Sequence, residues 1–265
     1  MRNLLLGTAN NILQHIDKIR LWHNSFKKVC DGDIMLLVPG LTDEDTVLLG
    51  DIPHTGVEQK EGVTVNNDRL IHQEMYLRNH LKDYDCVLVT DVFDVAFLND
   101  PFNRFELDRY DLYYAGEGVL HREEPWNNDV LMKSFPDEVA NLQDKEIICS
   151  GIIAGRPLHV ANLLGLMWMK CILTKGHDIR DQAALNIIHY EASPYFPRER
   201  TKLLNINDNW CLHCAVGGPT QFFESWGFKN TLAKRYKIPK YEDYCIVHQF
   251  NRIPAWNEQI QEYGR

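Results

Sequence analysis

The stretch Asp85-Cys-Val-Leu-Val-Thr-Asp-Val-Phe-Asp-Val95 joins a short apolar run to two carboxylates. The run from Cys86 to Val89 is continuous and rich in β-branched residues, which is typical of a strand buried on both faces. In open α/β sheets, ligands bind just beyond the carboxyl ends of the strands. We therefore expect Asp91 and Asp94 to lie close together at the mouth of a cleft.

Similar apolar runs alternate with helical patterns along most of the chain. Strands are expected at residues 4–6, 34–38, 63–65, 86–89, 112–115, 147–155 and 245–247. Helices are expected from residue 12 to about 26, from 67 or 68 to about 81, over 158–173 and from 181 onward. Strands that alternate with helices of this length indicate βαβ units, so the sequence predicts an α/β fold with a mostly parallel central sheet.

The loops between these elements supply further candidate residues. The loop after the first strand opens on the same edge as Asp91, so Thr8, Ala9 and Asn10 are candidates for binding a nucleotide base. Gly116-Glu-Gly118 is expected to form a turn after the strand at 112–115. The polar residues 121–145 predict a loop that contains a helix and could lie over the cleft.

Composition and charge limit the classes of function. The 265 residues suit one α/β domain, and a formal net charge of -9 argues against nonspecific nucleic-acid binding. The seven scattered cysteines favour reduced thiols and a cytoplasmic protein. Cys211-Leu-His-Cys214 resembles half of a zinc site, but no second pair lies at a suitable spacing. No apolar run approaches the ~20 residues of a transmembrane helix, so none is expected.

Four blocks follow one another in an informative order. They are Thr-Asp-Val-Phe-Asp-Val at 90–95 with Asp-Pro-Phe at 100–102, Cys-Ser-Gly at 149–151, Asp-Gln-Ala-Ala-Leu-Asn at 181–186 and Val-His-Gln-Phe-Asn at 247–251. Together they resemble the GT-A class of metal-dependent glycosyltransferases. That class carries an acidic pair after a buried strand, an Asn-Ser-Gly-like step, a DQxxLN helix and a late metal-binding histidine. The order resembles the glycogenin and lipopolysaccharide-transferase group, and the Asp-x-x-Asp spacing resembles collagen-modifying and chlorella-virus glycosyltransferases.

This resemblance implies a Rossmann-like GT-A domain over residues 1–265, with a nucleotide-binding half at 1–115 and an acceptor-binding half at 116–265. It implies transfer of a sugar from a nucleotide-diphosphate sugar, with UDP favoured, to a hydroxyl of a glycan or glycoprotein acceptor. Retention of the anomeric configuration is slightly favoured over inversion. Hard oxygen ligands suit Mn²⁺ or Mg²⁺, and an added imidazole shifts the preference toward Mn²⁺.

The resemblance also implies roles for particular residues. The metal ligands would be Asp91, Asp94 and His248. The donor would be held by Arg69, Asp91, Ser150, Gly151 and Arg252, in addition to the loop after the first strand. Asp181 and Glu117 are the candidate catalytic carboxylates, since inversion needs a base near the acceptor hydroxyl.

Two departures from the pattern and several simpler interpretations stay open. Cys149 stands where asparagine is usual, and Ile253-Pro-Ala-Trp256 replaces a Lys-Pro-Trp ending, so Arg252 would have to replace that lysine. The acidic pair could instead only cap a turn, Asp181 could only face a helix dipole, and Arg69 could be a surface residue. The tryptophans at 126, 210 and 226 could stack on acceptor sugars, although packing is the commoner role.

Two other functions compete with sugar transfer. A phosphatase-like hydrolase with an aspartate nucleophile also places an acidic pair after a strand. In that class, however, the pair lies near the N-terminus and has Asp-x-Asp spacing. A sugar-nucleotide binding protein without turnover is the third possibility.

Overall fold

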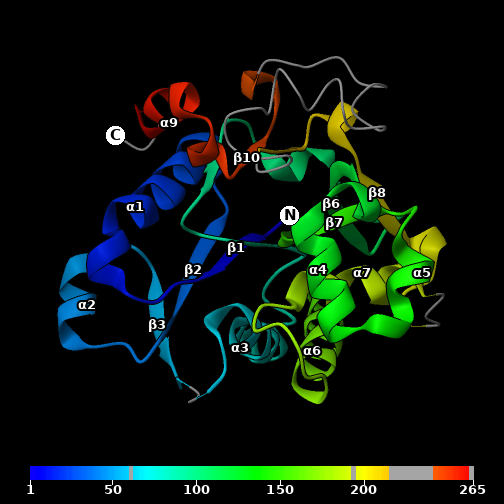
Figure 1. The fold of residues 1–265 in the computed structure, drawn as a ribbon. Coiled ribbons are helices and arrows are strands. Elements are labelled where there is room, and N and C mark those ends of the chain that lie inside the picture. The colour runs from blue at the N-terminus through cyan, green and yellow to red at the C-terminus, as the bar shows by residue number, and fades with distance from the viewer. Residues whose placement is uncertain (60–61, 192–194, 215–240, 263–265) are drawn as a thin grey trace.

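A computed structural model of the chain describes residues 1–59, 62–191, 195–214 and 241–262. In this part of the chain the main sheet has seven strands (Figure 1). Their order is β3 (His54–Val57), β2 (Asp33–Pro39), β1 (Asn3–Thr8), β4 (Cys86–Thr90), β7 (Glu146–Gly155), β6 (Leu112–Leu120) and β8 (Thr201–Leu204). Only β7 runs antiparallel to its neighbours, so the predicted mostly parallel α/β sheet is confirmed.

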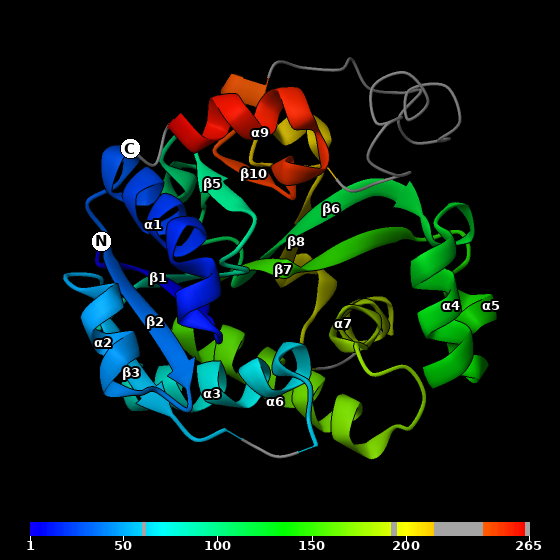
Figure 2. The ribbon, with the colours of Figure 1, turned by 60° about the vertical axis from the view of Figure 1, so that its left-hand side comes forward.

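Helices cover both faces of this sheet, which explains the continuous apolar strands. On one face, Leu5 and Leu88 pack with α1 (Ile12–Val29). On the other, the alternate residues of the same strands pack with α3 (Val65–Asn79), α6 (Pro157–Leu173) and α7 (Asp181–Tyr190). Figure 2 shows α1 on one side of the sheet and α3, α6 and α7 on the other.

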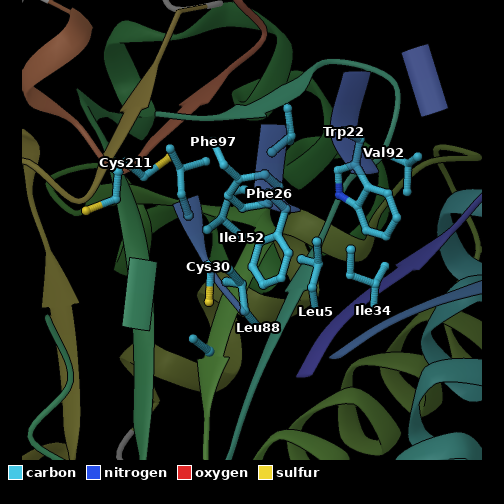
Figure 3. Close-up of a cluster of buried hydrophobic side chains, with 14 of the residues drawn as sticks. Leu5, Trp22, Phe26, Cys30, Ile34, Leu88, Val92, Phe97, Ile152 and Cys211 are labelled. Carbon is cyan, nitrogen blue, oxygen red and sulfur yellow. The ribbon is translucent and has the colours of Figure 1, made fainter. Parts of the chain in front are cut away.

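The core under α1 fixes the helix against the end of β4. Figure 3 shows Trp22 and Phe26 of α1 directed toward Leu5 and Leu88 of the sheet. The indole Nε1 of Trp22 donates a hydrogen bond to the hydroxyl of Thr90, 2.8 Å away. This contact anchors the residue that immediately precedes Asp91.

A second sheet lies beside the acidic pair, and it has three strands in the described residues. Its order is β5 (Val95–Phe97), β10 (Ile246–His248) and β9 (Cys211–His213). Strand β5 starts directly after Asp94 and pairs antiparallel with β10, so that His248 lies opposite Val95. This pairing brings the late histidine next to the acidic pair across some 150 residues of chain.

The remaining α-helices of the described residues are short. They are α2 (Asp43–Leu49), α4 (Pro125–Ser134), α5 (Val139–Leu142) and α9 (Pro254–Gln261). The predicted helix within residues 121–145 is therefore present as α4, and α5 follows it. No helix in the described ranges is long and apolar enough to cross a membrane.

Two local predictions were wrong. The expected strand at Val63–Val65 is absent, because Val65 opens α3 after Thr64; the third strand is His54–Val57. Two valines are too short an apolar run to distinguish a strand from the first turn of a helix. Likewise Gly116-Glu-Gly118 does not end its strand: β6 continues to Leu120, with an irregular pairing to β7 after Gly116.

Candidate metal and donor site

A cavity of about 570 Å³ opens at the carboxyl end of β4. Its wall is formed by residues of α3, β6, α4, β7, α7, β9 and β10, together with Asp91, which directly follows β4. Most of the residues predicted to bind the donor or the metal or to act in catalysis line it: Arg69, Asp91, Glu117, Ser150, Gly151, Asp181, His248 and Arg252. The cleft expected beyond Asp91 is therefore present.

Asp91 and His248 line this cavity, and Asp94 lies next to both of them. The Nε2 atom of His248 lies 3.3 Å from Oδ2 of Asp91 and 3.5 Å from Oδ1 of Asp94. Candidate ligand atoms of the three residues all lie within 4.8 Å of one another. This Nε2 atom is buried and makes no hydrogen bond with any described residue. A buried imidazole nitrogen that faces two carboxylates and has no hydrogen bond of good geometry fits a divalent cation.

The charges of this group support the same interpretation. Burial alone would raise the pKa of Asp94, but the nearby rings of His248 and His213 and the Arg252 guanidinium lower it overall. Burial alone would lower the pKa of His248, but Cys149 and Asp94 raise it well above its usual value. Asp91 and Asp94 thus favour a positive charge beside Nε2 of His248, where a metal ion would lie.

Arg69 ties the acidic pair to the start of α7. Its guanidinium pairs with Oδ1 of Asp91 and lies 2.7 Å from Oδ2 of Asp181. The planar guanidinium fork suits two such contacts at once. Because Arg69 holds Oδ1 of Asp91, the second oxygen of that carboxylate stays directed toward His248.

The Cys-Ser-Gly step of β7 forms the neighbouring wall. The Ser150 hydroxyl donates to Oδ2 of Asp181 (3.1 Å), and the Ser150 amide donates to Oε1 of Gln182 (3.1 Å). The Asp91 amide donates to the Gly151 carbonyl (2.8 Å). A Cβ atom on Gly151 would collide with the Asp91 carboxylate and lie 2.9 Å from Cε1 of His248. Only glycine leaves room for the acidic pair here.

Glu117 enters the cavity from the irregular segment of β6. Bulges of this kind often redirect a side chain near a site. Burial raises the pKa of Glu117 to about 8. Its Oε1 atom lies 3.5 Å from Nε2 of His213, a buried residue of β9.

The outer wall comes from α4. Trp126 is 45% exposed, and its ring contacts His177 edge to face, with the centroids 5.7 Å apart. Next to it, Oδ1 of Asn127 accepts a hydrogen bond from Gln182 (2.8 Å), and Glu124 accepts one from the Asn127 amide (2.7 Å). The predicted helix of this region therefore lies beside the cavity.

Several other candidates lie elsewhere. Ala9 is buried in the core, and the Thr8 hydroxyl accepts a hydrogen bond from Gln73 (3.1 Å); neither they nor Asn10 line the 570 Å³ cavity. Trp210 is fully buried and donates to the Pro101 carbonyl, so it cannot stack on an acceptor. Trp226 lies outside the described residues.

The two cysteines of the Cys211-Leu-His-Cys214 motif do not form a shared metal site. Cys211 packs in the core under α1, whereas Cys214 belongs to a different apolar cluster. All seven cysteines are buried free thiols.

Sequence reasoning missed His213, Gln182, Asn127 of α4 and Glu124, which caps that helix. Gln182 stood inside the quoted block at 181–186, so a signal for it existed. His213 stood inside the Cys211-Leu-His-Cys214 motif, but nothing there indicated a contact with His248, because that contact depends on the parallel pairing of β9 with β10.

This α/β fold is similar to that of a glycosyltransferase. A solved structure of the bifunctional glycosyltransferase WbbM in its apo form matches with a TM-score of 0.58 and 13% sequence identity. The match covers 99% of this chain and 51% of that one, so the present chain spans about half the length of the WbbM chain. No family model matches the sequence, and no curated protein matches it. At this identity the likeness concerns the fold.

Proposed function

We propose that this protein is a metal-dependent GT-A glycosyltransferase that moves a sugar from a nucleotide-diphosphate sugar, with UDP favoured, to a hydroxyl of a glycan or glycoprotein. The observation that carries the proposal is the convergence of Asp91, Asp94 and His248 beside a cavity that Arg69 and Asp181 also line. The glycosyltransferase-like fold supports it.

In this proposal Asp91, Asp94 and His248 hold Mn²⁺ or Mg²⁺. The ion would supply Lewis-acid stabilisation of the negative charge that develops on the departing nucleotide diphosphate. Arg69 keeps Asp91 oriented, and the exposed Arg252 adds a cationic side chain to the same cavity.

In this proposal the two halves of the chain bind different substrates. Residues 1–115 would bind the nucleotide, with Thr8 and Asn10 at the edge where β1 and β4 end in register and the buried Ala9 supporting them from the core. Residues 116–265 would bind the acceptor. Ser150, Gly151 and Asp181 line the intervening space, where the donor sugar would lie. The exposed indole of Trp126 offers the acceptor glycan a stacking surface.

The hydrogen bonds and protonation of three further acidic residues in the cavity, Asp181, Glu124 and Glu117, favour retention of the anomeric configuration. Asp181 accepts hydrogen bonds from Arg69 and Ser150, and Glu124 caps α4. Burial keeps Glu117 protonated up to about pH 8, because its pKa is raised to about 8. None of these three is thus a ready base at neutral pH, as inversion would need.

Ligand-dependent thermal stability tests the proposal. We expect UDP and Mn²⁺ together to raise the melting temperature, and each alone to have little effect, because ligands that bind only the folded state stabilise it. Asp94→Asn should abolish the joint shift. Asp108→Asn, which removes an exposed carboxylate outside the cavity, should retain it.

The same measurement with GDP, CMP and NAD, each with and without Mn²⁺, shows which nucleotide the protein prefers. If no nucleotide shifts the melting temperature in the presence of Mn²⁺, the proposal that a metal ion helps to bind the donor is wrong. Release of phosphate from simple phosphate esters would then favour the hydrolase alternative.

A further inference from the structure

A row of buried polar side chains leads away from the acidic pair on the far side of His248. The Nδ1 atom of His248 lies 3.1 Å from Nδ1 of His213. The Nε2 atom of His213 lies 3.5 Å from Oε1 of Glu117. The three residues are 1%, 7% and 5% exposed and come from β10, β9 and β6.

The chemistry of imidazole fixes the direction of hydrogen bonding along this row. If Nε2 of His248 offers its lone pair to a cation, the proton of the neutral ring must be on Nδ1. That proton then needs an acceptor, and Nδ1 of His213 lies at hydrogen-bond distance. An accepting Nδ1 on His213 places its own proton on Nε2, which faces the Glu117 carboxyl oxygen.

We propose that His213 and Glu117 are positioning residues, which hold His248 in the tautomer and orientation that present Nε2 to the cation. The proposal rests on the metal site of the proposed function. A partner on the second nitrogen of a metal-bound histidine fixes the ring and raises its basicity, and loss of such partners typically lowers metal affinity.

Cys149 is the competing partner of the same nitrogen. Its Sγ atom lies 3.4 Å from Nδ1 of His248, and Cys149, His213 and His248 could together hold a soft metal ion. Sulfur is a weak hydrogen-bond acceptor, whereas an imidazole nitrogen is a strong one. The orientation of His213 toward Glu117 also favours His213 as the acceptor.

Mn²⁺ affinity, measured by the electron paramagnetic resonance signal of free Mn²⁺ with and without UDP, tests this without an activity assay. His213→Leu removes the acceptor at similar size, and we expect it to weaken Mn²⁺ binding about 10- to 100-fold. His213→Asn places an amide oxygen near the former Nδ1 and should recover most of the affinity. Glu117→Gln, which keeps an acceptor oxygen, should bind better than Glu117→Leu.

Cys149→Ala removes the competing partner and should weaken Mn²⁺ binding much less than His213→Leu does. Circular dichroism shows whether each variant is folded. If folded His213→Leu and His213→Asn both bind Mn²⁺ like the wild type, the positioning role is wrong while the metal site stands. If the wild type binds no Mn²⁺ even with UDP, the metal site itself fails. If Zn²⁺ binds to the wild type and this binding is lost equally in Cys149→Ala and His213→Leu, Cys149 and His213 are themselves metal ligands. That result would overturn the proposal.

Discussion

At the scale of single residues, the absence of a side chain at Gly151 is as important as the charges around it. A methyl group there would press on the Asp91 carboxylate and the His248 ring. We predict that Gly151→Ala loses most Mn²⁺ affinity, which electron paramagnetic resonance would detect. Gly165→Ala is the control: on α6 its Cβ would make only an ordinary contact, 3.5 Å from Glu74, and alanine favours helix. Unchanged Mn²⁺ binding in Gly151→Ala would contradict the close approach seen here.

At the scale of elements, Asn186 joins α7 to β7. Its side chain accepts hydrogen bonds from the Ile148 amide (2.9 Å) and His121 (3.1 Å), and donates to the Ile148 carbonyl (2.9 Å). We predict that Asn186→Leu lowers the free energy of unfolding by about 3 kcal/mol, because it leaves buried polar groups unpaired. Urea denaturation would measure this, with the exposed Asn141→Leu as a control expected to change little. Equal losses in the two variants would show that Asn186 is not the link between α7 and β7.

At the scale of the whole molecule, buried histidines make stability depend on pH. Burial lowers the pKa of His121 from 6.5 to about 4, and its Nδ1 has no hydrogen-bond partner among the described residues. Between these two values the unfolded chain binds a proton that the folded chain does not, so stability falls as the pH falls from 6.5 toward 4. From the size of this shift, His121 contributes about 3 kcal/mol to the change.

Glu117 acts in the opposite direction, because its raised pKa favours the folded state at lower pH. The comparison of wild type with His121→Gln isolates the histidine. We predict that His121→Gln weakens the loss of stability between pH 6.5 and 4, as measured by urea denaturation across that range. Parallel pH profiles for the two proteins would refute this assignment.

From the amino-acid sequence alone, the class of fold and the candidate carboxylates could be predicted. The apolar run before Asp91 marks a strand buried on both faces, and alternation with helices marks a mostly parallel sheet. The position of a residue at the end of such a strand is a local property, so Asp91 and Asp94 could be recognised without a structure. The order of the four blocks then indicated His248 and Asp181.

The contacts among these residues became visible only in the folded chain. The pairing of Arg69 with both Asp91 and Asp181 joins residues far apart in the chain. The entry of Glu117 depends on an irregular pairing of β6 with β7, and the contact of His213 with His248 depends on the register of two three-residue strands. Such contacts follow from strand pairing and packing, which the period of apolar residues along one segment does not encode. The sequence could therefore indicate the candidate ligands of a metal, whereas the row of residues behind His248 became visible only in the folded molecule.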